Sequence, residues 1–285
     1  MKNNIPAIEL RIRPGASWRR IDWVALWTYR DLLFLLVRRD FLSKYSQTLL
    51  GPIWFVIQPL VTTLLFTVVF AGVAKISTNG SPPLLFYLSG MLPWNYFSNT
   101  FNATALTLTA NAGLFGKVYF PRLIVPIGVA VSNLFAFAIH FILIAAVYLA
   151  FRMFGTSEVA GLRWELLLIP FVVIQVGALG LGAGLWMSAI TTKYRDFVHV
   201  SGFVVSILFY ATPVIFPLSI VPNKIIFLVM LNPLTFSEEA FRYILLGVGI
   251  FNPMLAISSF GTTIMLLISG IFAFQKCERT FIDTV

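Results

Sequence analysis

Few side chains in this sequence could carry out acid–base, nucleophilic or metal chemistry. Among 285 residues there are 11 acidic residues, two histidines and one cysteine. The sequence contains no H-E-x-x-H zinc pattern, no nucleotide-binding G-x-x-x-x-G-K-[ST] pattern and no candidate set of serine, histidine and aspartate. The lone cysteine, Cys277, cannot form an internal disulfide or a thiolate metal cluster. The sequence therefore predicts no catalytic, metal or nucleotide site of these kinds.

The two histidines, His140 and His199, lie in strongly apolar stretches. An ionisable residue within the membrane is a functional candidate by default, but a lone neutral histidine that hydrogen-bonds to a neighbouring helix is the commoner case. Ion-coupled transporters usually carry acidic residues in their spans, and the apolar stretches of this chain have none. This pattern argues against an ion-coupled mechanism.

The elements that hold these residues are overwhelmingly apolar. The chain is 59% hydrophobic and 11% charged, with a mean hydropathy of +0.89, whereas a soluble domain carries about 25% charged residues. This composition excludes a cytosolic enzyme, a nucleic-acid-binding protein and a secreted disulfide scaffold. It predicts a membrane protein that crosses the bilayer several times, and the net charge of +9 then bears on topology.

A helix that spans a bilayer needs about 20 mostly apolar residues. Six segments meet this requirement and predict an all-α protein with six transmembrane helices. They comprise residues 52–74, 83–110, 123–151, 166–191, 197–216 and 254–274. The second segment is unusual because its second half is polar, with Ser98, Asn99, Thr100, Asn102 and Thr104.

Two other stretches are too short or too interrupted to cross. After a variable tail at 1–20, residues 21–50 combine tryptophans, basic residues and a short apolar run. This combination predicts an amphipathic helix at the cytoplasmic interface of the membrane, and a soluble helix packed on a neighbouring domain is the alternative. Prolines divide residues 217–253 into short pieces, which predicts a re-entrant segment on the extracellular side.

Basic residues indicate the orientation of the spans. Fifteen of them lie in the pieces between or beside spans that would face the cytoplasm, namely residues 1–51, 111–122, 192–196 and 275–285. Five lie in the outer pieces, residues 75–82, 152–165 and 217–253. Because cytoplasmic loops carry an excess of Lys and Arg, both termini are predicted to be cytoplasmic. The first residues do not resemble a signal peptide.

Several segments resemble permease subunits of type-2 ABC exporters that move polysaccharides. The opening signature of that family is matched by RRDFLSKYSQTLLGPIWFVIQPL (38–60), through Lys44, Tyr45, Gln47, Thr48, Leu50, Gly51, Trp54 and Pro59. Later parts of the family are matched, in the family's order, by GLFGKVYFPRLIVP (113–126), TTKYRDFVHV (191–200), ATPVIFPLSIVP (211–222) and LNPLTFSEEAFRYILLG (231–247). The likeness covers nearly the whole chain from about Arg30 onward.

The resemblance implies a six-span homodimer in the bacterial inner membrane that works with two copies of a separate ABC ATPase. It places ATP and Mg²⁺ on that ATPase and no cofactor in this chain, so the chain is a transport subunit and no enzyme. The implied substrate is a polyprenyl-linked polysaccharide, which would follow an aromatic-lined path, and no nucleic acid is involved.

The first cytoplasmic loop would then dock on the ATPase, through Phe115, Lys117, Val118, Tyr119, Phe120 and Arg122. Aromatic side chains can anchor in a partner's pocket and basic groups can pair with its acids. A plain positive-inside loop is the alternative, but it does not account for three aromatic residues. A second contact would be made by Tyr194, Arg195 and Asp196, and a solvated turn explains these residues equally well.

The interface helix offers residues that could meet the headgroup of the lipid carrier as it approaches, namely Trp23, Trp27, Arg30, Arg38, Arg39, Lys44 and Tyr45. Arginine suits phosphate geometry, although ordinary attraction to anionic membrane lipid explains the basic residues equally well. In the re-entrant segment, Glu238, Glu239 and Arg242 are expected either to gate the exit or to solvate it.

These features predict a permease that exports an O-antigen-like, lipid-linked polysaccharide with energy from a partner ATPase. An exporter of the same fold that moves a drug or another lipid is an alternative, because fold-mates differ in substrate. A membrane glycosyltransferase or polymerase is another, but it would need a constellation of carboxylates that the spans lack. A structural membrane scaffold is the third.

Overall fold

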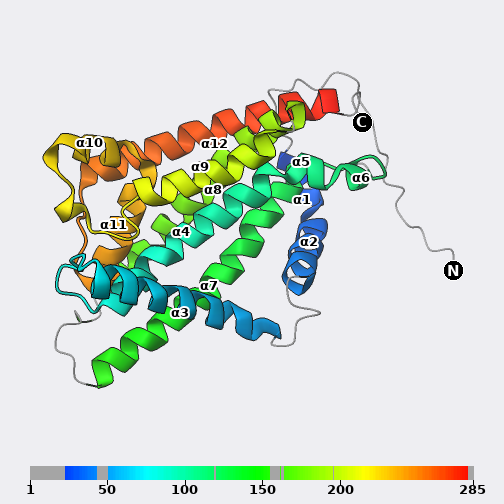
Figure 1. Ribbon diagram of the computed structural model, residues 1–285. Coiled ribbons are helices and arrows are strands. Elements are labelled where there is room, and N and C mark those ends of the chain that lie inside the picture. The colour runs from blue at the N-terminus through cyan, green and yellow to red at the C-terminus, as the bar shows by residue number, and fades with distance from the viewer. Residues whose placement is uncertain are drawn as a thin grey trace.

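The computed structural model describes residues 23–43, 51–118, 120–154, 161, 164–194 and 196–281, and every regular element in these ranges is a helix (Figure 1). The predicted all-α fold is therefore confirmed. The longer helices are α3 (Trp54–Phe66) with its π-helical continuation η2 (Thr67–Val73), α4 (Pro83–Ala105), α7 (Ile124–Met153), α8 (Ile169–Lys193), α9 (Phe197–Ala211) and α12 (Pro253–Phe281). The shorter ones are α1 (Trp23–Thr28), α2 (Arg30–Ser43), η1 (Gly51–Ile53), α5 (Thr107–Ala110), α6 (Ala112–Phe115), η3 (Trp164–Leu168), η4 (Leu218–Ile220), α10 (Asn223–Leu231) and α11 (Pro233–Leu246).

Four helical stretches in the described ranges are long and apolar enough to cross a membrane: Trp54–Val73, Ile124–Met153, Trp164–Lys193 and Pro253–Glu278. They account for four of the six predicted spans, and the count of six stays a prediction. Helix α4 has the length but not the apolar character, and α9 has only 15 residues. Helix α4 is packed against α3, α7, α8, α9 and α11, so most of its surface meets protein rather than lipid.

Helix α9 ends at Ala211, before the predicted limit of its span at Phe216. Thr212 is extended, with φ −103° and ψ 142°, as expected for a residue that precedes proline. The second predicted span likewise divides at Leu106 into α4 and the short α5.

Helix α8 forms the centre of the bundle and uses glycines to approach its neighbours closely. A Cβ at Gly184 would lie 2.9 Å from the carbonyl oxygen of Phe101 on α4, and one at Gly182 would lie 2.7 Å from Cα of Leu267 on α12. Larger residues at these two positions would push both neighbouring helices away. The glycines therefore allow α4 and α12 to pack on two sides of α8.

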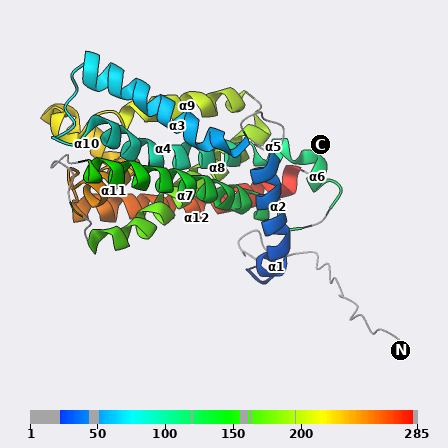
Figure 2. The same ribbon diagram turned by 90° about the horizontal axis from the view of Figure 1, so that it is seen from below.

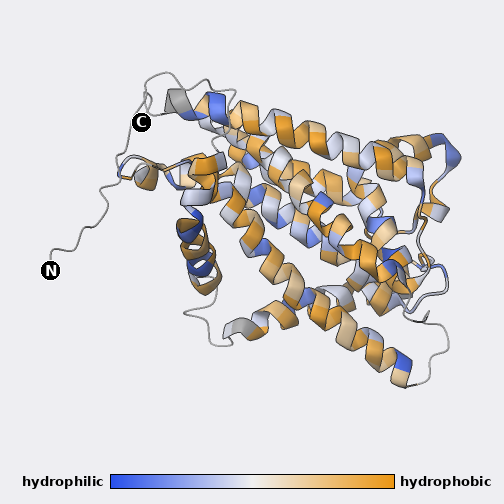
Figure 3. Cartoon of the chain, turned by 180° about the vertical axis from the view of Figure 1, so that it is seen from behind, coloured by the Kyte–Doolittle hydropathy of each residue, from blue (hydrophilic) through white to orange (hydrophobic). Residues whose placement is uncertain are grey.

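The two ends of the bundle differ in the elements they carry. Helices α1, α2, α5 and α6 lie at the same end as the C-terminal part of α12, and α10 and α11 lie at the other end (Figure 1). The long outer helices are mostly hydrophobic along their length, and hydrophilic residues occur mainly near both of their ends (Figure 3). The predicted cytoplasmic pieces are thus gathered at one end, and the side of the membrane that this end faces stays a prediction.

The span Trp54–Val73, formed by α3 and η2, is the least enclosed of the four candidate spans. Only 6% of the residues in its membrane window are buried. At its first end Phe55 contacts His140 of α7, and at its other end Phe66 contacts Tyr87 of α4 and Phe209 of α9. Helices α3 and α9 lie on the same side of α4 (Figure 2).

Candidate functional site

The first loop between spans is anchored inside the chain. Phe115 and Phe120 are buried, with ring centroids 5.8 Å apart. They belong to one hydrophobic cluster with Leu36, Leu108, Leu123, Ile124, Val125, Leu185 and Phe274. The loop is therefore held by contacts with α2, α5, α7, α8 and α12.

Arg122 ties the same loop to the last helix. Its Nη1 donates a 2.7 Å hydrogen bond to the backbone oxygen of Glu278, and its Nε lies 3.7 Å from Oε1 of that residue. The guanidinium also lies 5.4 Å from the ring centroid of Phe115. Because Arg122 is buried, these contacts fix the end of the loop where α7 begins.

The exposed part of this loop, among the residues described, is short and not aromatic. It consists of Gly116, Lys117 and Val118, and the side chain of Val118 is 53% exposed. Tyr119 lies outside the described residues. The expectation that Phe115, Phe120 and Arg122 reach a partner does not fit this conformation, since these side chains already pack within the chain.

The second predicted contact lies at the same end of the bundle, after α8. Tyr194 is 53% exposed, its ring lies 6.1 Å from that of Phe197, and Lys193 Nζ lies 5.2 Å from its centroid. Asp196 is also exposed, whereas Arg195 lies outside the described residues. The end of α8 is joined to α4 by a 2.9 Å hydrogen bond from Thr191 Oγ1 to the oxygen of Ala105. Both exposed loop tips are therefore attached to helices at this end of the bundle, the first to α12 through Arg122 and the second to α4 through Thr191.

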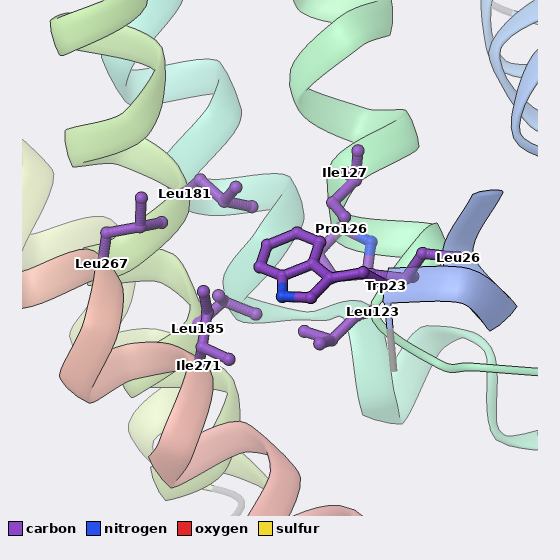
Figure 4. Close-up of a pocket in the computed structure, with 9 residues that line it drawn as sticks. All are labelled: Trp23, Leu26, Leu123, Pro126, Ile127, Leu181, Leu185, Leu267 and Ile271. Atoms are coloured by element: carbon purple, nitrogen blue, oxygen red, sulfur yellow. The ribbon is translucent and has the colours of Figure 1, made fainter. Parts of the chain in front are cut away.

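The two tryptophans of the interface helix lie at the surface of the chain. Trp23 and Trp27 are exposed, and α1 has no buried residue. Trp23 lies over an apolar pocket of about 170 Å³ between α1, α7, α8 and α12, lined by Leu26, Leu123, Pro126, Ile127, Leu181, Leu185, Leu267 and Ile271 (Figure 4). The ring of Trp23 therefore faces α7, α8 and α12 rather than α3.

The exposed basic residues of the interface helix already have acidic or aromatic neighbours on it. Arg30 lies 3.9 Å from Asp31 and 5.5 Å from the ring of Trp27, and Arg39 lies 2.8 Å from Asp40. Arg38 is exposed as well, while Lys44 and Tyr45 lie outside the described residues. Exposed pairs of this kind are weak, so these arginines stay available to a phosphate group.

The three charged residues of α11 form a buried cluster. The guanidinium of Arg242 donates to the backbone oxygens of Pro213 and Val214, lies 3.5 Å from Glu239 Oε1 and covers the ring of Phe86 at 4.0 Å. The carboxylate of Glu239 accepts from the backbone nitrogens of Leu218 and Ile250, at 3.2 and 3.0 Å. This arrangement, which we call the α11 clasp, joins α11 to α4, to the chain before α10 and to the chain after α11.

Glu238 lies beside the clasp and makes no hydrogen bond to the described residues. Burial raises the pKa of its carboxyl group well above the usual range, Arg242 opposes this shift and Glu239 adds to it. Since all three charged residues are buried, the expectation that they solvate the exit is wrong.

Comparison with known proteins identifies the family. Residues 31–246 match the family described as ABC-2 type transporter. The chain belongs to the ABC-2 type transporter membrane family. This membership confirms the resemblance drawn from the motifs, and the ABC-2 chain is accordingly a multi-pass membrane protein.

Several relatives of the ABC-2 chain are export proteins. Over 257 residues it is 26% identical to the O-antigen export system permease protein RfbA of Myxococcus xanthus, covering 89% of this chain and 95% of that protein. It is 24% identical over 254 residues to RfbA of Klebsiella pneumoniae, covering 89% and 94%. It is also 24% identical over 219 residues to the polysialic acid transport protein KpsM of Escherichia coli, covering 74% and 79%.

The predictions missed one polar contact of the ABC-2 chain, at Gln175, and noted Asn99 and Asn102 without placing them on one face with Asn95. Gln175 on α8 donates to Ser259 and Thr263 on α12 at 2.9 and 3.0 Å, and its oxygen accepts from Ser237 on α11. Asparagines also mark one face of α4, where their four- and three-residue spacing was a usable signal. Among the described residues, no group of acidic, histidine and cysteine side chains could hold a metal ion.

Proposed function

We propose that this chain is the transmembrane permease of an ATP-driven exporter that moves lipid-linked, O-antigen-like polysaccharide across the bacterial inner membrane. The observation that carries the proposal is the match to RfbA permeases over 89% of the chain and 94–95% of those proteins. A separate ABC ATPase binds ATP and Mg²⁺, and two copies of each subunit form the transporter. Both termini of the chain lie on the cytoplasmic side.

The arrangement of the loops supports coupling to such an ATPase. The tip at 116–118 and the residues Lys193, Tyr194 and Asp196 are exposed at the end of the bundle that carries the C-terminal part of α12. Their supports are buried and joined to α4 and α12 by the contacts of Thr191 and Arg122. Displacement of either tip by the ATPase would therefore also displace α4 or α12, to which the tips are joined.

The test is to purify the chain with its ATPase and to measure ATP hydrolysis and glycan export in proteoliposomes. Reversal of the exposed charge in Lys117→Glu should reduce export by about tenfold, because a basic tip would pair with acidic groups of the ATPase. Lys224→Glu is the matched control, since Lys224 is an exposed lysine on α10 at the opposite end. Equal export by the two variants would overturn docking through this tip.

A chain that never co-purifies with an ATPase would overturn the broader proposal. Phe120→Ala is a poor test of docking, because Phe120 is buried and its loss would leave a cavity in the cluster that anchors the loop.

A further inference from the structure

Three asparagines lie on one face of α4 that other helices do not cover. Asn99 is exposed, and Asn95 and Asn102 are partly exposed. Their spacing of four and three residues places them on one side of the helix, together with Met91, Ala103 and Leu106. We call Asn95, Asn99 and Asn102 the asparagine stripe.

The stripe differs from the other polar residues of the helix. Ser98, Thr100 and Thr104 are buried against the neighbouring helices. The side-chain amides of the stripe make no hydrogen bond to any described residue, although each can donate two and accept two. By contrast Asn133, on α7, donates to Thr100 Oγ1 at 3.4 Å.

Hydrocarbon is a poor environment for such a face. Transfer of an amide from water to an apolar medium is unfavourable unless the amide forms a hydrogen bond there. Exposed polar groups at membrane depth occur where they meet protein or water. The stripe therefore faces either a wet path or another protein surface.

The contacts of α4 show where the stripe lies. On one side Trp94 contacts Phe209 of α9, with ring centroids 5.2 Å apart. On the other side Tyr96 donates a 3.4 Å hydrogen bond to the oxygen of Ala130 on α7. The stripe lies between these two contacts, on the side of α4 that α3 and α9 flank (Figure 2).

At the end of the bundle that carries α10 and α11, aromatic side chains of α3 and α9 cover this side of α4. There Phe66 of α3 contacts both Tyr87 of α4 and Phe209 of α9, with centroids 6.3 and 6.0 Å apart. Phe70 also lies 6.2 Å from Tyr87. Aromatic side chains thus gather at the outer end of this side of α4, and amides occupy the part nearer the loops.

We propose that Asn95, Asn99 and Asn102 line the path of the exported glycan and hydrogen-bond to its hydroxyl groups. This proposal rests on the proposed function and names the contacts within it. A neutral amide both donates to and accepts from a hydroxyl group, without the strong fixed charge that would hold a moving chain in place. Spaced amides therefore suit a neutral polysaccharide that slides, and they add polar contacts to the expected aromatic ones.

Water access is the first test, in a Cys277→Ser background that removes the native thiol. Asn99→Cys should react with a charged, water-soluble thiol reagent, because the thiolate forms only in contact with water. Ile174→Cys on the exposed surface of α8 is the lipid-facing control and should not react. Bound lipid-linked glycan should slow the labelling of Asn99→Cys. Failure of Asn99→Cys to label, or labelling that bound glycan does not slow, overturns the proposal.

Transport is the second test, with the ATPase complex in proteoliposomes. Asn99→Leu with Asn102→Leu should reduce glycan export about tenfold while ATPase binding is unchanged. Asn99→Gln with Asn102→Gln keeps the amides and should retain most of the export. Normal export by the leucine variant would overturn the role of the stripe and leave the proposed function standing. Absence of export by the unaltered complex would instead overturn the proposed function.

Discussion

At the scale of single residues, the α11 clasp depends on space made by a glycine. A Cβ at Gly90 of α4 would lie 2.5 Å from Nη2 of Arg242 and 2.9 Å from the oxygen of Val214. We expect Gly90→Ala to displace the guanidinium and to lower the free energy of unfolding by about 1–3 kcal/mol, as overpacking does. The measurement is the midpoint of thermal unfolding of the purified protein in detergent.

The matched control is Gly261→Ala on α12, where an added Cβ would meet no atom within 4 Å. Alanine is favoured over glycine in a helix by about 1 kcal/mol, so this variant should unfold at the same or a higher temperature. Equal losses in the two variants would show that the clasp is insensitive to Gly90.

The α11 clasp also shows what the sequence could not indicate about its residues. Local pattern placed Glu239 and Arg242 outside the spans, which stays a prediction. It did not indicate that their partners include backbone groups at Pro213, Val214 and Ile250. Burial of a charged group requires such partners, and a linear pattern does not reveal which distant segments supply them. For the same reason, the sequence did not indicate that Phe115 and Phe120 are buried in a cluster with the distant residues Leu36 and Phe274.

At the scale of elements, α1 should lie in the headgroup region of the membrane. Trp23 is 67% exposed and Trp27 is 70% exposed, and tryptophan prefers the boundary between water and hydrocarbon. We expect lipids brominated close to the headgroup to quench the tryptophan fluorescence of the unaltered chain more than that of the Trp23→Phe/Trp27→Phe variant. Lipids brominated at the bilayer centre should not distinguish the two proteins.

Trp94→Phe is the control, because Trp94 is buried in α4 and its removal should leave the depth dependence unchanged. If the double variant behaves as the unaltered chain does, α1 lies away from the membrane and packs on another protein, which is the alternative interpretation of residues 21–50.

The elements themselves were largely predictable, because hydropathy and length depend on local sequence. Four predicted spans correspond to apolar helices of sufficient length, and the two stretches judged unable to cross form the short helices α1, α2, α10 and α11. Predictions were weakest for a helix that is surrounded by other helices, because its hydropathy then does not show which of its faces meet protein. Ser98, Thr100 and Thr104 of α4 are buried against neighbouring helices, whereas its asparagines lie on an uncovered face that could be recognised only after the neighbours were placed.

At the scale of the whole molecule, one chain leaves the proposed path open. The asparagine stripe lies on the surface of the chain, flanked by α3 and α9, and α3 is mostly exposed. Two-fold symmetry is the commonest arrangement of homodimers. A second copy related by a two-fold axis along the path would cover the open side of the stripe. That symmetry brings α3 of one copy next to α9 of the other.

This geometry predicts a specific cross-link between copies. Val61 on α3 and Phe203 on α9 are both exposed, and they lie five and six residues before the Phe66–Phe209 contact, so they share a similar depth. In the Cys277→Ser background, Val61→Cys/Phe203→Cys should form a disulfide-linked dimer on mild oxidation in membranes. Val61→Cys/Ile257→Cys should not, because α12 lies on the far side of the bundle from α3 (Figures 1 and 2). A dimer in both variants would indicate random collision, and its absence in both would place the partner of α3 elsewhere.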